Sequence, residues 1–258
     1  YERAGEIDID AFFTERDVTR RARRLADDVV AELERFRIEL VADPTLERYR
    51  DTPCARPHAC PVCAPDLPVA DHAHVSTLHR AGQLVQELLD EGITRIPDIP
   101  AERLHHRRQE IQQKTLIEGA PHVDAAAIRD FLATLRYPIS YLDFEATTSA
   151  IPPFDLVRGW EHVPYLSSLH RERERGELVQ TSFMMEPGTD GREEMVDRLL
   201  SDAGPEGSIV VYSAGFERGI LQRLAEVVPD RRGELERLIE RIVDLLEPFN
   251  QFHFYHYD

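Results

Sequence analysis

Lysine, cysteine and long hydrophobic runs are all scarce in this sequence. Of its 31 basic residues only Lys114 is a lysine, a bias that we ascribe to base composition rather than to chemistry. No apolar run reaches membrane-spanning length and no signal peptide is visible, so we expect a cytoplasmic protein without a membrane partner. The chain starts at Tyr1 and stops after a strand-like aromatic run, which suggests a piece of something longer. Its oligomeric state is left open.

The only three cysteines, Cys54, Cys60 and Cys63, fall in one proline-rich loop. Such clustering excludes the disulfide framework of a secreted domain. Three thiolates in one loop can instead bind Zn²⁺ or a [4Fe-4S] cluster, because sulfur suits soft metals. The fourth ligand is left open among His58, His72, His74 and a cysteine outside this chain. The alternative is three reduced structural thiols.

The formal net charge is −17, which excludes a simple DNA coat protein that binds by neutralising phosphates. A metal-dependent nuclease is compatible with this charge, since its carboxylates need cations and its substrate channel can be locally basic. The alternative reading of the acidity is solubility.

Hydrophobic periodicity divides the chain into three regions. Residues 1–75 contain a long amphipathic helix from about residue 18 to 41 and then the cysteine loop. Residues 76–136 form a helical connector, with a helical hairpin that stops at Gly92 and resumes near Pro100, and a last helix capped by Asp124. Residues 137–258 are α/β, and the expected elements are strands at 138–147, 163–170, 177–184 and 208–213, helices at 192–203, 216–228 and 232–241, and a short strand or helix edge at 242–246.

Two carboxylates lie on the first strand of the α/β region, in the run Tyr141-Leu142-Asp143-Phe144-Glu145. Because side chains alternate along a strand, Asp143 and Glu145 point to the same face. Burial of two acids without a counter-charge is costly, and Mg²⁺ or Mn²⁺ would remove that cost. A second apolar strand, starting at Ser208, runs through a small turn into a helix that opens with Glu217. The alternative is a strand end with two solvated acids.

Residues 137–258 resemble the ribonuclease H-like fold, and within it the DEDD class of 3′–5′ exonucleases. The Asp143-x-Glu145 strand is similar to the first motif of that class, and Tyr212-Ser213-Ala214-Gly215-Phe216-Glu217 is similar to the second. More closely, the chain resembles an uncharacterised bacterial family in which such a domain follows a RecB-like PD-(D/E)XK nuclease module. The start of the chain and the cysteine loop look like the tail of that module, where cysteines can hold an iron–sulfur cluster.

The resemblance implies a metal site built from Asp143, Glu145 and Glu217. Two departures weaken it: Glu217 stands where the class has Asp, and Ser213 where it has Asn. The third motif should lie beyond Asp258. Asp244 resembles the structural acid of the preceding strand, with a direct role left open. His170 could approach the metal cleft, although a structural histidine is the alternative.

The resemblance therefore implies a two-metal nuclease, a 3′–5′ exonuclease-like phosphodiester hydrolase with a role in DNA repair, acting on DNA in preference to RNA. The alternative is a catalytically degenerate nucleic-acid-binding or scaffold domain of a larger nuclease. Trp160 could stack on a base, but core or lid packing is the expected role, and His253, Tyr255 and His256 are expected to be core or edge aromatics.

Overall fold

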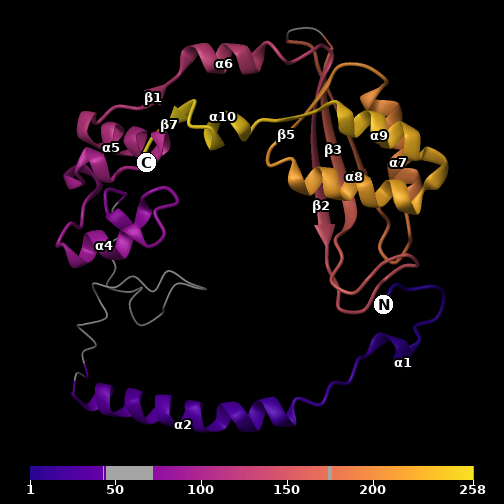
Figure 1. The fold of residues 1–258 in the computed structure, drawn as a ribbon. Coiled ribbons are helices and arrows are strands. Elements are labelled where there is room, and N and C mark those ends of the chain that lie inside the picture. The colour runs from indigo at the N-terminus through magenta and orange to yellow at the C-terminus, as the bar shows by residue number, and fades with distance from the viewer. Residues whose placement is uncertain (43, 45–71, 174–175, 258) are drawn as a thin grey trace. The chain divides into compact units, whose positions relative to one another are not determined.

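The computed structural model describes residues 1–42, 44, 72–173 and 176–257 of the chain (Figure 1). These residues form two compact units with separate hydrophobic cores. The α/β unit comprises Tyr1–Phe13 and His122–Tyr255, and the helical unit comprises Thr14–Pro121 with the residues from His256 onward. The helical unit is therefore inserted into the α/β unit, after its first thirteen residues.

The α/β unit is built on a five-stranded mixed sheet in the order β4-β3-β2-β5-β6. β2, β3 and β4 are antiparallel neighbours, whereas β5 runs parallel to β2 and β6 runs parallel to β5. The mixed α/β sheet with flanking helices expected from the sequence is confirmed. The strands span Ile139–Thr147 (β2), Val163–Glu172 (β3), Leu178–Met184 (β4), Ser208–Val211 (β5) and Ile242–Asp244 (β6).

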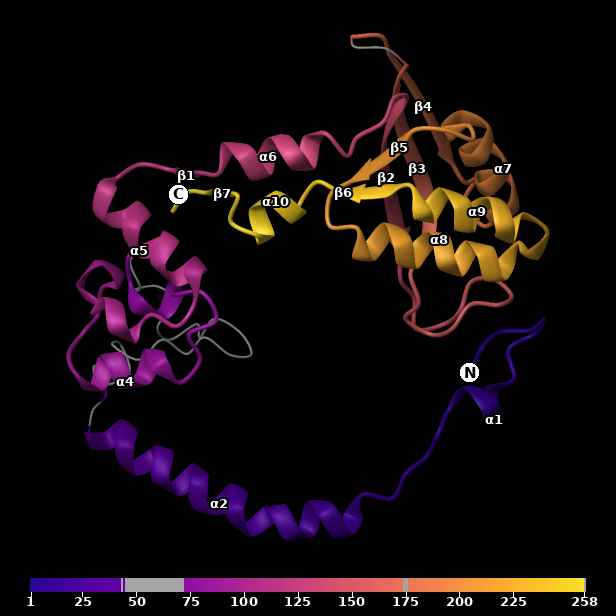
Figure 2. The same cartoon turned by 45° about the horizontal axis from the view of Figure 1, so that its top comes forward.

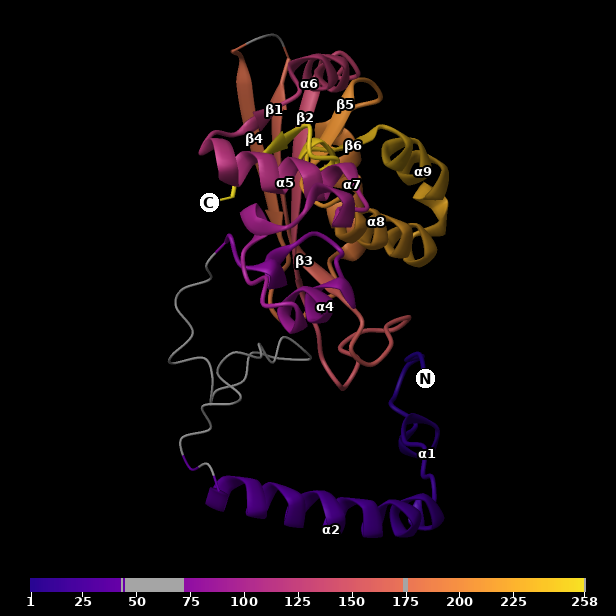
Figure 3. The ribbon, with the colours of Figure 1, turned by 60° about the vertical axis from the view of Figure 1, so that its left-hand side comes forward.

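Three helices cover one face of this sheet, and Figure 2 shows two of them, α8 and α9, side by side. They are α7 (Arg192–Ala203), α8 (Gly215–Val227) and α9 (Arg232–Glu240), and a short 3-10 turn at Pro229–Arg231 joins the last two. In Figure 3, α8 and α9 lie on the same side of β5 and β6. Leu142 and Phe144 of β2 are buried in the core with these helices, because alternate residues of a strand face the same side.

Asp143 and Glu145 alternate with those two buried residues and are exposed on the opposite face. The expectation that they share a face is confirmed. β5 ends two residues earlier than expected, at Val211, because Ser213 has a left-handed backbone with φ 68°. Its start requires Gly207, which has φ +85° and whose Cα faces the carbonyl of Pro138 so closely that a Cβ would clash.

Residues 122–136, expected in the connector, belong to the α/β unit. Strand β1 (His122–Val123) pairs antiparallel with β7 (Phe254–Tyr255), and the Asp124 side chain caps α6 (Ala125–Leu132) by accepting from Ala127 N at 3.0 Å. The short helix α10 (Glu247–Asn250) contacts α6. These contacts join residues 122–136 to the C-terminal residues of the α/β unit. Local periodicity in the sequence does not reveal such long-range pairings.

The helical unit contains a small core formed by short elements around α5 (Arg107–Glu118). The continuous helix expected from residue 76 is wrong, because Arg80 and Gly82 have positive φ and break it. The helix expected near Pro100 is also wrong: Leu104 is buried and extended, so α5 begins only at Arg107. The other elements are the 3-10 turns Val75–Thr77, Ile96–Asp98 and Ala101–Arg103, and α4 (Leu84–Asp90), which ends before Gly92 as expected.

Two buried glutamines of α5 help to hold the helical unit together, since each hydrogen-bonds to backbone groups of other segments. Gln109 donates to His79 O at 2.9 Å and accepts from His105 N at 2.8 Å. Gln112 accepts from His79 N at 2.6 Å and donates to Thr77 O at 3.1 Å. Both link α5 to the segment before α4.

The long amphipathic helix expected at residues 18–41 is confirmed as α2 (Thr19–Ala42), whose apolar residues are largely exposed. A four-residue helix, α1 (Ile9–Phe12), precedes it and is capped by Asp8. Within the part of the chain that the structure describes, no helix is both long and apolar enough to cross a membrane.

Candidate functional site

The strand register places the first strand's acids beside the turn that leads into α8. β2 and β5 are parallel, with Tyr141 opposite Val210. Continuing that register puts Asp143 level with Tyr212, where β5 has ended and the turn begins. On the other side, Asp143 lies opposite Ser168 of β3, and a bulge follows Glu145. Bulges of this kind re-aim neighbouring side chains.

Glu217, in the first turn of α8, is a buried acid. The residue is only 4% exposed, and among the described residues its Oε2 has no hydrogen-bond partner. Burial raises the pKa of Glu217, its own backbone N–H opposes this, and the negative charges of Asp143 and Asp244 raise the pKa further. A buried carboxylate oxygen without a partner is costly, so the site favours a bound proton or cation.

Asp244 is fully engaged with the backbone of the turn. Its Oδ1 accepts from Ser213 N and Leu246 N, both at 2.9 Å, and its Oδ2 accepts from Ala214 N at 3.0 Å. These bonds hold Ser213 in its left-handed conformation and fix the start of α8. Asp244 therefore positions Glu217, which agrees with the structural role that its sequence context suggests.

The negative charges of Asp143 and Asp244 act on Glu217, whereas other candidates are placed differently. Glu145 lies farther along the face of Asp143, and the charges that act on Glu217 are those of Asp143 and Asp244. His170 of β3 lies opposite Tyr141, two residue pairs away from Asp143 and Ser168. Among the described residues, no three His, Cys, Asp or Glu side chains stand close enough to hold a metal ion as they are.

The cysteine loop, with Cys54, Cys60, Cys63 and His58, lies outside the described residues. Of the other suggested ligands, His72 is exposed, and His74 has its Nδ1 2.8 Å from Ser76 Oγ. His253 has a buried Nδ1 that finds no hydrogen-bond partner within the part of the chain that the structure describes, and Tyr255 carries a ring that stacks on Phe252.

Aromatic side chains flank the carboxylates from a loop that sequence reasoning did not connect to them. His162 contacts Phe216 edge-on, with ring centroids 5.4 Å apart, and Phe216 directly precedes Glu217. Trp160 is 70% exposed, so it does not pack in the core, whereas packing in a lid and stacking on a base stay predictions. No signal in the sequence pairs residue 162 with residue 216, because the contact depends on how the loop between β2 and β3 closes over α8.

A family model described as a domain of unknown function (DUF2779) matches residues 140–258. This region begins in β2 and includes all three clustered carboxylates. Comparisons with curated proteins and with solved structures gave no significant match.

Proposed function

We propose that the α/β unit is a metal-dependent nuclease domain, a 3′–5′ exonuclease-like phosphodiester hydrolase that acts on DNA in preference to RNA. One observation carries the proposal: Glu217 is a buried carboxylate with an unpartnered oxygen beside the charge of Asp143. Placing two acids in this way without a permanent counter-charge is expected of a cation site. The ribonuclease H-like resemblance implies the same pair of residues.

The residues present fit Mg²⁺ or Mn²⁺, which both take hard carboxylate oxygens. Asp143 and Glu217 would hold the ion, with Glu145 joining from the same strand face. A bound divalent ion supplies a water of lowered pKa and charge stabilisation for a leaving 3′-oxygen. Asp244 would not ligate, because its oxygens already accept three backbone hydrogen bonds. Its part is to keep the first turn of α8, and so Glu217, beside β2.

The competing proposal is a degenerate nucleic-acid-binding or scaffold domain of a larger nuclease, one that keeps the fold without the chemistry. It is favoured by the finding that, among the described residues, no three His, Cys, Asp or Glu side chains stand close enough to hold a metal ion. The replacement of the Asp and Asn of the exonuclease motif by Glu217 and Ser213 also favours a domain without catalysis.

A manganese titration followed by a nuclease assay on the full-length protein separates the two. We expect Mn²⁺ to raise the melting temperature and support hydrolysis of a labelled oligonucleotide, DNA or RNA. Asp143→Ala, Glu145→Ala and Glu217→Ala should abolish hydrolysis. Glu236→Ala, which removes an exposed acid of α9, is the matched control. It should change neither the rise in melting temperature with Mn²⁺ nor the rate of hydrolysis. Manganese-independent stability and equal activity in all variants would support the degenerate domain.

The cysteine loop is a second proposed metal site, for Zn²⁺ or a [4Fe-4S] cluster. Iron and zinc analysis of freshly purified protein, with Cys60→Ala as the comparison, decides between a cluster, zinc and free thiols.

A further inference from the structure

The first five residues of the chain, here called the N-terminal clasp, bind the loop that joins β2 to β3. The backbone N–H of Arg3 donates to Val157 O at 3.0 Å, and the carbonyl of Arg3 accepts from Leu156 N at 2.8 Å. The Arg3 guanidinium donates to the carbonyls of Pro152 and Pro153 at 3.0 and 2.7 Å. These contacts join residues about 150 positions apart in the sequence. The clasp is thus part of the α/β unit, although the whole helical unit follows it.

Arg223 of α8 ties the clasp to the same loop. Its guanidinium donates to Glu2 Oε2 at 2.9 Å and to Glu161 Oε1 at 2.5 Å, and it also binds Leu156 O and Glu226. The Arg223 side chain is 19% exposed, so these charges are partly shielded from water. Glu2 also pairs with Arg158, at 3.2 Å. One arginine therefore links the clasp, the loop and the helix that carries Glu217.

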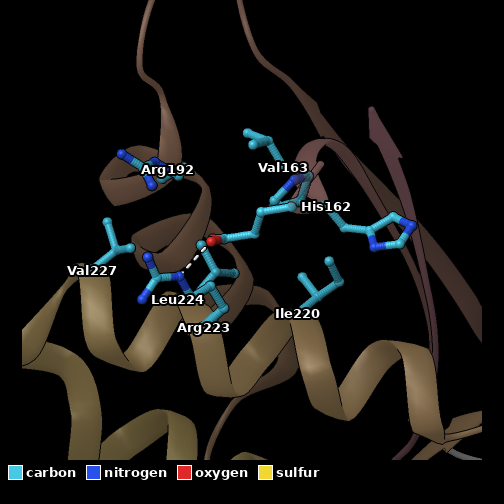
Figure 4. A pocket seen from close by; sticks show the side chains of 9 residues that line it. His162, Val163, Arg192, Ile220, Arg223, Leu224 and Val227 are labelled. Carbon is cyan, nitrogen blue, oxygen red and sulfur yellow. Dashed lines mark hydrogen bonds and ion pairs between the residues drawn. The ribbon is translucent and has the colours of Figure 1, made fainter. Parts of the chain in front are cut away.

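The loop between β2 and β3 also contacts the elements that carry the carboxylates. Glu161 bonds to Arg223. The ring of the next residue, His162, is turned away from Arg223 (Figure 4). That ring packs edge-on against Phe216, the residue before Glu217. The other end of the loop continues from β2, which carries Asp143 and Glu145. Both sides of the carboxylate cluster thus depend on one loop conformation.

We propose that the N-terminal clasp is a positioning element of the carboxylate site. By holding the 149–162 loop, Glu2, Arg3 and Arg223 keep His162 against Phe216 and thereby fix the first turn of α8, where Glu217 lies. The clasp lies within the first thirteen residues of the α/β unit, after which the helical unit is inserted. The catalytic part of this idea rests on the proposed function, whereas its structural part does not.

Hydrogen exchange on the full chain tests the structural part, with Glu2→Ala and Arg3→Ala as variants. We expect amide exchange to rise about tenfold both in residues 155–162 and in residues 214–219, because lost charge-assisted bonds release the loop and then the turn. Arg198→Ala, which removes an exposed ion pair elsewhere on α7, is the control and should leave both segments unchanged. Faster exchange confined to residues 1–8 would overturn the proposal.

Manganese affinity tests the positioning role. Glu2→Ala should weaken Mn²⁺ binding severalfold, and Glu2→Gln, which can still accept from Arg223, should restore part of it. If the wild type binds Mn²⁺ and the clasp variants bind it equally well, the clasp proposal fails and the nuclease proposal stands. If the wild type binds no Mn²⁺, the nuclease proposal fails, and the exchange data alone decide whether the clasp orders the loop and α8.

Discussion

At the residue scale, the defining feature of the site is that Glu217 is buried while its Oε2 has no hydrogen-bond partner among the described residues. The shared face of Asp143 and Glu145 can be predicted, since the alternation around them is plain in the sequence, but their exposure matches the alternative of two solvated acids and not the expected burial. The burial of Glu217 could not be predicted, because it depends on how α8 packs on the sheet. The three backbone bonds of Asp244 were likewise hidden, as they depend on a turn some thirty residues away.

The raised pKa of Glu217 predicts a pH dependence of stability. Its folded pKa lies above the unfolded value of 4.5, so the folded protein binds more protons between the two. Stability should therefore fall as pH rises from about the unfolded pKa through the folded one, and stay reduced at neutral pH. Glu217→Gln should raise the melting temperature of the metal-free protein at pH 7 and flatten this slope, as measured by differential scanning calorimetry.

The matched comparison is Mn²⁺ addition at the same pH. The ion should stabilise the wild type more at pH 7 than at pH 4 and have no such effect on Glu217→Gln. An unchanged slope in the variant would show that the pKa of Glu217 is not raised in the folded protein.

Asp244 and Asp143 should behave in opposite ways on substitution. Asp244→Ala leaves three backbone N–H groups without their acceptor and should lower the free energy of unfolding by about 1–3 kcal/mol. Asp143→Ala, at an exposed position, should change it by only about 0.5 kcal/mol, yet remove the response to Mn²⁺. Urea denaturation with and without Mn²⁺ measures both. Equal destabilisation by the two variants would contradict the division into a positioning and a ligating acid.

At the scale of elements, regular segments followed from the sequence and irregular ones did not. α2, α7, α8 and the antiparallel pair β3 and β4 match the expected segments because their periodicity is long and uninterrupted. The helical hairpin was misjudged, since buried Leu104 and the left-handed Arg80 override local helix propensity. Tertiary packing decides such short segments, and the glutamines of α5 that enforce it look like ordinary surface residues in the sequence.

Two glycines make a matched test of helix and strand-start geometry. Gly219 lies inside α8, and a Cβ there would meet nothing within 4 Å. Gly219→Ala should therefore stabilise the protein by about 0.5–1 kcal/mol through helix propensity. Gly207→Ala should destabilise it strongly, because a Cβ would clash with Pro138 O and φ is +85°. Thermal melting of the two variants gives the comparison, and a destabilising Gly219→Ala would show an unseen contact on α8.

At the scale of the whole molecule, the two units have separate cores and should unfold separately. Leu88 and Leu235 are both fully buried, the first in the helical unit and the second in the α/β unit. Each Leu→Ala change should destabilise its own unit by about 2–5 kcal/mol. Hydrogen exchange should show Leu88→Ala accelerating α4 and α5 while leaving β2 and α8 protected, and Leu235→Ala the reverse. Acceleration of both units by either variant would indicate one cooperative structure.

The clasp also sets an order of events for a chain that emerges from the ribosome. Glu2 binds Arg223, which is synthesised 221 residues later. The inserted helical unit can acquire its core before that, because its contacts are local. The contact of Glu2 with Arg223 therefore forms only after α8 has been synthesised, so the core of the helical unit can form before the carboxylate site is assembled.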